Sequence, residues 1–237
     1  TVFDNDGTLI KVWGEAGEEE GQLNGPSSMA FDADDNVWIV NSFNSRIQKF
    51  TRDGKYLSSF GTKGDGAGDL DMPWGITIDD YGQVYVADWK NHRVQKLTAD
   101  GDFVAQFGRG GTKKGELSYP TDVAVDPEGD VYICDWSKNN WDRGRVHIFD
   151  AGGNFLTSLV GDAQQLSAWA QLTVDANADY IKRRREVSST EPEWTFAQPT
   201  AVEYDAANAR LLVVDTQRSR IQIYSKQHGY LVPQLNL

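Results

Sequence analysis

The chain has one cysteine and no long apolar run. Cys134 is the single cysteine among 237 residues, so no disulfide can form within the chain. We expect Cys134 to be a small buried residue rather than a reactive thiol. No apolar stretch approaches the roughly 20 residues that a membrane-spanning helix needs, so the sequence predicts no membrane partner. A lone thiol leaves the cellular compartment unknown.

Positive charge is also scarce. The chain has 23 Lys and Arg against 35 Asp and Glu, a formal net charge of −12. Such a field repels phosphate backbones and disfavours nucleic-acid binding. The one basic run, Lys182 to Arg185, is expected on a helix, where it faces water or docks on the acidic scaffold. Contact with an anionic partner such as RNA is the alternative.

The sequence does contain a unit that recurs. Pro26, Pro73 and Pro120 open three copies at a spacing of 47 residues, and Pro199 opens a fourth. In each copy a strand-like run ends in Asp, and a turn and a second run follow. An Arg-led third run, a Gly turn and a fourth run close the copy. Four short strands in about 40–50 residues are the signature of a propeller blade, so the sequence predicts an all-β propeller.

We interpret residues 1–237 as one propeller body with four and a half four-stranded blades. Residues 1–14 are expected to form an outer half blade, because Thr1 falls where Gln48 lies within a third strand. Complete blades are expected at residues 26–61, 73–108, 120–161 and 199–232. We therefore expect this chain to be the C-terminal part of a longer protein. Its open N-terminal blade edge would invite self-association or attachment of further blades.

Two places break the repeat. Residues 162–198 form an insertion in which Leu166, Trp169, Ala170 and Val174 recur near i, i+3, i+4 and i+8, as on one face of a helix. The second break is a longer loop after Asp135. We expect both breaks to lie on the same face of the propeller, where function usually resides on loops.

Several runs resemble NHL repeats. The closest matches are Asn44-Ser45-Arg46-Ile47-Gln48, Asn91-His92-Arg93-Val94-Gln95 and the Val84 to Asp88 run. The resemblance covers residues 1–161 and 199–232 and implies a propeller of about six blades. It indicates little about function, because the family includes RNA-binding, protein-binding and sensor modules, and a peptidylglycine-amidating lyase has a similar fold.

Metal and catalytic constellations are sparse. The histidines His92, His147 and His228 fall on separate repeats, and the sequence marks neither His92 nor His147 as special. They do not supply the converging ligands of a catalytic zinc. The longer loop holds the remaining metal candidates, for calcium or zinc: Asn139, Asn140 and Asp142. Otherwise we expect no catalytic residue and no cofactor.

Tryptophans are the main candidates for ligand binding. Trp89 and Trp136 follow the repeated Asp, where other copies have Ser42 and Thr216. With them we place four more candidates on the same face or the adjoining inner strand: Trp74, Trp141, Thr121 and Asp122. Packing between loops is the alternative role for the tryptophans. The repeated Asp and Arg, such as Asp88 and Arg93, are expected to brace their loop.

Three functions follow as hypotheses. The leading one is a non-catalytic interaction scaffold that binds a protein, peptide or carbohydrate on the tryptophan-bearing face. The alternative is a propeller-type lyase or lactonase with a metal near the central channel, to which Asp122 would contribute. The third is RNA binding through Lys182 to Arg185, with affinity that falls steeply with salt.

Overall fold

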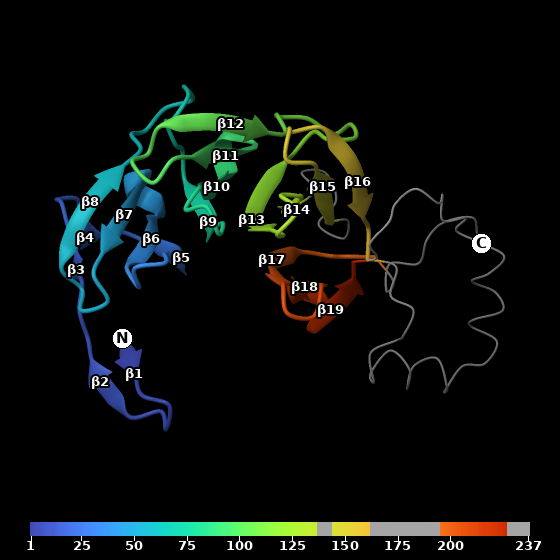
Figure 1. The fold of residues 1–237 in the computed structure, drawn as a ribbon. Coiled ribbons are helices and arrows are strands. Elements are labelled where there is room, and N and C mark those ends of the chain that lie inside the picture. The colour runs from blue at the N-terminus through green and yellow to red at the C-terminus, as the bar shows by residue number, and fades with distance from the viewer. Residues whose placement is uncertain (137–143, 162–194, 227–237) are drawn as a thin grey trace, which may run out of the picture.

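The computed structural model of the chain describes residues 1–136, 144–161 and 195–226. Four β-sheets follow one another in an arc, with their first strands, β5, β9, β13 and β17, on the inside (Figure 1). This arrangement confirms the predicted all-β propeller. None of the helices within the described ranges is long and apolar enough to cross a membrane.

Each blade is an antiparallel sheet whose strands run in chain order from the inner to the outer edge. Blade 1 contains β5 (Pro26–Phe31), β6 (Val37–Asn41), β7 (Arg46–Phe50) and β8 (Tyr56–Phe60). Blade 2 contains β9 (Pro73–Ile78), β10 (Val84–Asp88), β11 (Arg93–Leu97) and β12 (Phe103–Phe107). Blade 3 contains β13 (Tyr119–Val125), β14 (Val131–Trp136), β15 (Arg145–Phe149) and β16 (Phe155–Leu159). Blade 4 contains β17 (Pro199–Asp205), β18 (Arg210–Asp215) and β19 (Arg220–Ser225).

Short elements complete the architecture. The β1 (Val2–Phe3) and β2 (Leu9–Lys11) strands form an antiparallel pair. In the connection that follows, β3 (Glu15–Ala16) pairs with β4 (Gln22–Leu23) in parallel. Three 3-10 turns join the second and third strands of their blades: η1 (Ser42–Asn44), η2 (Trp89–Asn91) and η3 (Thr216–Arg218).

Parts of the sequence-based prediction are not confirmed. The structure describes four blades and the β1–β2 pair, so a count of six is not confirmed. Of the expected helical insertion, only residues 195–198 belong to the described part, and these are not helical. The fourth strand expected near residues 229–232 lies outside the described residues.

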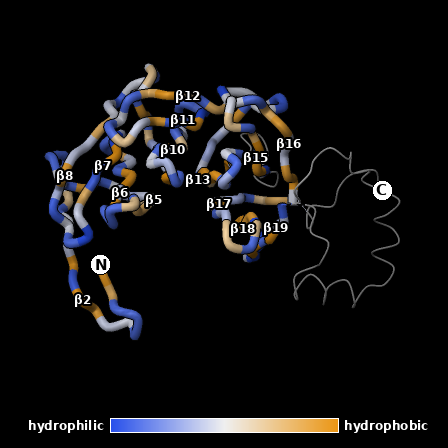
Figure 2. Tube along the Cα trace, in the orientation of Figure 1, coloured by the Kyte–Doolittle hydropathy of each residue, from blue (hydrophilic) through white to orange (hydrophobic). Residues whose placement is uncertain are grey.

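The core lies between neighbouring blades. Side chains on both faces of β6 and β10 are buried, because each of these sheets is covered on two sides. Trp38 and Val40 of blade 1, for example, pack in one cluster with Ile76, Val84 and Val86 of blade 2. Figure 2 shows hydrophobic residues along many strands and hydrophilic residues in many turns. Burial of this apolar surface is the main force that joins the blades.

The antiparallel pairing gives the propeller two distinct ends. Pro73 at the start of β9 pairs with Asp88 at the end of β10. The blade-to-blade connections and the η turns therefore share one end, which we call the connection face. The turns between first and second strands, and between third and fourth strands, lie at the other end, which we call the turn face.

Candidate ligand-binding site

The connection face is braced by buried carboxylates at the ends of the second strands of blades 2, 3 and 4. Asp88 Oδ1 accepts a hydrogen bond from the Asp71 backbone N–H at 2.8 Å. Asp135 does the same for Ser118 and Tyr119, at 2.8 and 2.7 Å. These bonds agree with the structural role expected for the repeated Asp, and they hold the connections on which the aromatic side chains stand.

Four aromatic side chains meet on this face. Trp74 lies at the start of β9, and Trp89 begins the η2 turn after β10. Tyr119 and Trp136 stand opposite each other, because the first residue of β13 pairs with the last residue of β14. All four are partly exposed. We call Trp74, Trp89, Tyr119 and Trp136 the tryptophan cluster.

The rings of the tryptophan cluster are in direct contact. Trp74 lies 5.5 Å from Trp89 and 5.0 Å from Trp136, measured between ring centroids, with the second pair edge to face at 79°. Trp89 stacks on Tyr119 at 4.7 Å and 27°. His92 adds a fifth ring 5.5 Å from Tyr119. Such offset and edge-to-face contacts fix ring orientation, so the cluster presents a preformed aromatic surface.

Hydrogen bonds fix one edge of the tryptophan cluster. Trp136 Nε1 donates to the Pro199 carbonyl oxygen at 3.0 Å, which ties blade 3 to the start of blade 4. Thr121 Oγ1 donates to the same carbonyl at 3.1 Å. Trp89 Nε1 has no hydrogen-bond partner in the described part of the chain. Trp136 is therefore more constrained than Trp89, which makes Trp89 the better position for mutagenesis.

Asp122 lies on the inner strand beside a bulge in β13. Its Oδ2 accepts a hydrogen bond from the Val202 backbone N–H of blade 4 at 2.9 Å. On its other side is Gly75, where an added Cβ would lie 2.3 Å from Asp122 Oδ1. Burial raises the pKa of this carboxyl to about 7. Asp122 thus joins two blades and can exchange a proton near neutral pH.

Part of the predicted site falls in segments that the structure does not describe. Trp141, Asn139, Asn140 and Asp142 lie outside the described residues, as does the basic run Lys182 to Arg185. Within the described ranges, no group of three or more His, Cys, Asp or Glu side chains is placed to hold a metal ion. The predicted contributions of these residues to metal or RNA binding remain predictions.

Two residues of interest were not identified from the sequence. Tyr119 stands where Gly25 and Met72 stand in the preceding copies, so a break in the repeat was the available signal. His147 is fully buried, with its Nε2 3.6 Å from Asp135 Oδ2. The sequence signal for His147 was its replacement of the repeated Gln48 and Gln95, which are also fully buried.

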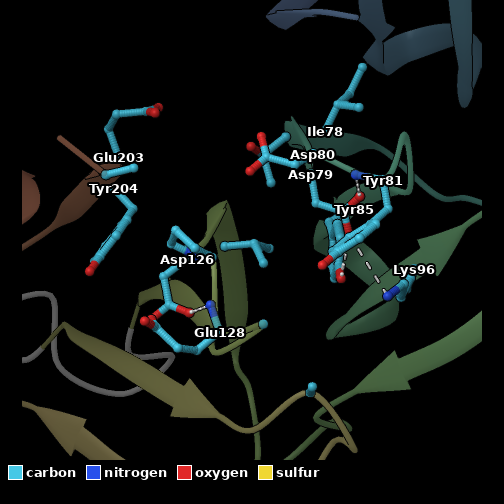
Figure 3. Close-up of a pocket in the computed structure, with 16 residues that line it drawn as sticks. Ile78, Asp79, Asp80, Tyr81, Tyr85, Lys96, Asp126, Glu128, Glu203 and Tyr204 are labelled. Carbon is cyan, nitrogen blue, oxygen red and sulfur yellow. Dashed lines mark hydrogen bonds and ion pairs between the residues drawn. The ribbon is translucent and has the colours of Figure 1, made fainter. Parts of the chain in front are cut away.

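A separate cavity of about 380 Å³ opens on the turn face, between the first turns of blades 2, 3 and 4 (Figure 3). Its walls carry five carboxylates: Asp79, Asp80, Asp126, Glu128 and Glu203. Tyr85 donates to Asp79 Oδ2 at 3.2 Å, and Lys96 Nζ lies 5.0 Å from the centre of the Tyr85 ring. Burial raises the pKa of Glu203. Most of this wall is engaged in contacts that hold its own turns.

Comparison with known proteins identifies the repeat. The sequence profile described as NHL repeat matches residues 70–97 and 117–149, which are the central parts of blades 2 and 3. No curated protein sequence matches the chain.

Solved structures share the fold at low identity. A protein of unknown function from Bacteroides thetaiotaomicron has 18 % identity and a TM-score of 0.55, with 84 % of this chain and 47 % of that chain covered. A gluconolactonase from Xanthomonas campestris has 14 % identity and a TM-score of 0.57, with 89 % and 61 % covered. Virginiamycin B lyase from Staphylococcus aureus has 13 % identity and a TM-score of 0.48, with 94 % and 61 % covered.

This chain therefore spans about half to three fifths of the length of the structures that it matches. At these identities the likeness concerns the fold and not the activity. The matched repeats and the four successive antiparallel sheets make this chain an NHL-repeat β-propeller.

Proposed function

We propose that the chain is a non-catalytic interaction module that binds a protein, peptide or carbohydrate through the tryptophan cluster. The observation that carries the proposal is the meeting of four partly exposed aromatic rings on the connection face. Tryptophan and tyrosine supply much of the binding energy in interfaces, because they bury a large area with few rotatable bonds.

The neighbouring blades suggest which ligand chemistry fits. The tryptophan cluster lies on blades 2 and 3, and the blades on either side of it, blades 1 and 4, carry pairs of hydroxyl groups at the positions of Trp74 and Trp89. Ser27 Oγ lies 2.7 Å from Ser42 Oγ in blade 1, and the corresponding distance between Thr200 and Thr216 in blade 4 is 2.5 Å. The face is thus apolar in its centre and polar at its sides. A sugar with an apolar ring face, or a peptide with a proline or aromatic residue between polar ones, suits this pattern.

A lyase or lactonase with a metal near the channel is the second candidate. The observation that favours it is Asp122, an inner-strand carboxyl with a pKa of about 7 that is suited to proton transfer at neutral pH. RNA binding through Lys182 to Arg185 has less support, since the net charge of the chain is −12.

A ligand search with matched variants tests the proposal. The chain would be applied to glycan and peptide arrays beside Trp89→Ala and Tyr81→Ala. Tyr81 is 84 % exposed on the turn face and serves as the control aromatic residue. Signals lost in Trp89→Ala and kept in Tyr81→Ala support the cluster as the binding site. Signals that survive in Trp89→Ala contradict it, and one bound metal equivalent by elemental analysis would favour the enzyme.

A further inference from the structure

Two carboxylates that line the cavity on the turn face are not used to hold the turns. Asp80 in the first turn of blade 2 and Glu203 on β17 are exposed, and the carboxylate of neither has a hydrogen bond or ion pair to another described residue. Tyr81 follows Asp80, Tyr204 follows Glu203, and both tyrosines line the same cavity (Figure 3). Blade 3 completes the wall, so the cavity does not depend on blade 1 or on the β1–β2 pair.

The junction between blades 3 and 4 shows what fits a wall of this kind. Lys226 follows β19 of blade 4 and reaches the first turn of blade 3, where its Nζ donates to the Asp126 carboxylate. The same Nζ donates to Glu128 Oε2 at 3.0 Å and to Asp130 Oδ2 at 2.9 Å. The Lys226 side chain is only 6 % exposed. An ammonium group on an apolar stem thus fills the space between the turns of two successive blades.

The repeat places Ala151 in blade 3 where Lys226 stands in blade 4. Both residues stand six positions after the Arg that begins the third strand of their blade. Ala151 lines the cavity, and its methyl group leaves open the space that a lysine side chain fills at the next junction. The facing turn of blade 2 carries Asp79 at the place of Asp126. The cavity is therefore the open counterpart of the Lys226 site.

The positive charge already present leaves the cavity wall acidic. Among the described residues that line the cavity, Lys96 is the one cation against five carboxylates, and Lys226 offsets two of these from outside. Lys96 Nζ lies 3.9 Å from Asp79 Oδ2, whereas the corresponding atoms of Lys49 and Asp32 in blade 1 are 2.8 Å apart. The net charge of −12 adds to the attraction of a cation toward this wall.

We propose that this cavity binds the side chain of a lysine from a protein or peptide partner. The ammonium group would pair with Asp80 and Glu203, and the alkyl stem would pack on Ala151 and Tyr81, as the stem of Lys226 does between the next two blades. Exposed ion pairs are weak, so a single lysine should bind with a Kd of roughly 1 mM. The cavity lies on the turn face, which makes this inference independent of the function proposed for the tryptophan cluster.

Two capped amino acids test the need for an ammonium group. Acetyl-lysine amide, acetylated on its α-nitrogen, is the probe, and acetyl-norleucine amide has a similar stem without the charge. Binding is followed by NMR titration of the labelled chain. The lysine probe should bind at least about fivefold more tightly than the norleucine control, and this advantage should shrink at high salt. Equal binding of the two would overturn the proposal, as would binding of the free diamine cadaverine without binding of the lysine probe.

Ala151→Lys tests the location of the site. The new lysine should fill the cavity as Lys226 fills the next junction, raise Tm by about 2–4 °C and weaken binding of the lysine probe at least about fivefold. Ala99→Lys is the matched control, because Ala99 has the same repeat position in blade 2 and the change in net charge is identical. It should leave binding of the probe unchanged.

Two further variants keep the result clear. Glu203→Gln removes one free carboxylate without a change in size and should weaken binding of the lysine probe about threefold or more. Trp89→Ala on the connection face should bind the probe like the parent. Parental affinity in both Ala151→Lys and Glu203→Gln would overturn the assignment of lysine binding to this cavity, whatever the outcome for the tryptophan cluster.

Discussion

Asp88 and Arg93 form a buried ion pair across the η2 turn, with 2.8 Å between Asp88 Oδ2 and Arg93 Nε. The guanidinium also donates to the backbone carbonyls of Asp65, Gly66 and Asp69 in the preceding connection. The pair thus joins two strands and one connection, and burial raises the pKa of Asp88. The corresponding pair in blade 4 joins Asp215 and Arg220 at 3.0 Å.

Removal of this carboxylate should strongly destabilise the fold. Asp88→Ala would leave the Arg93 charge buried and unpaired, with an expected loss of ~3–5 kcal/mol in the free energy of unfolding. Asp88→Asn keeps an oxygen for the Asp71 N–H, as Asn41 does for Asn24 in blade 1 at 2.7 Å. Its loss should be smaller, about 1–3 kcal/mol. Urea unfolding of both variants measures the difference, and equal losses would contradict the bracing role.

Asp122 should make stability depend on pH. In the folded state the pKa of its carboxyl is about 7, whereas the ordinary pKa of 3.8 applies in the unfolded chain. Between these values the folded state binds more protons, so stability is highest at low pH and falls as pH rises toward 7. The titration of Asp122 contributes at most ~4 kcal/mol to this fall in the free energy of unfolding.

Asp122→Asn separates this contribution from that of other carboxyls. Asn keeps an acceptor for the Val202 N–H and does not titrate, so the stability of the variant should exceed that of the parent at pH 8 and approach it at pH 5. Chemical unfolding at several pH values provides the measurement. A parallel decline of both proteins from pH 5 to pH 8 would show that Asp122 is not the titrating group.

His147 is expected to be a suboptimal residue at its position. In blade 2 the corresponding Gln95 donates from Nε2 to the Asp69 carbonyl at 2.6 Å and to Asp88 Oδ2 at 3.3 Å. His147 Nε2 and Asp135 Oδ2 have no hydrogen-bond partner within the part of the chain that the structure describes. His147→Gln should therefore stabilise the fold by roughly 1–2 kcal/mol, because a buried polar group without a partner is costly.

The reciprocal change serves as a control for His147. Gln95→His should destabilise blade 2 by at least a similar amount, since it removes three hydrogen bonds of the Gln95 side chain, to the Asp69 carbonyl, to Asp88 Oδ2 and from the Gly68 N–H. Thermal unfolding of the two variants and their parent provides the comparison. A loss of stability in His147→Gln would contradict the interpretation and would mean that the imidazole makes a needed contact with Asp135.

Much of the fold could be predicted from the sequence because the repeat fixes the strands. Pro26, Pro73 and Pro120 each lie at or next to the start of a first strand, and the Arg-led runs became β7, β11 and β15. The number of blades could not be settled in this way, since a repeat gives the form of a unit and not how many units close a ring.

The candidate site was predictable only in part. The tryptophans stood out because they replace small residues of the repeat, and Trp74, Trp89 and Trp136 do come together. Tyr119 was missed, because its contact with Trp89 depends on how two blades pack and not on the pattern within one copy. The environment of His147 was missed for the same reason, since a single substitution does not reveal burial.

A binding titration tests the central claim most directly. A ligand selected on the arrays is titrated into the parent chain and into three variants. We predict that Trp74→Ala and Trp89→Ala each weaken binding at least about tenfold, equivalent to ~1.4 kcal/mol, with an unchanged fold. The control Tyr81→Ala should bind like the parent. Equal affinities for all four proteins would contradict the assignment of ligand binding to the tryptophan cluster.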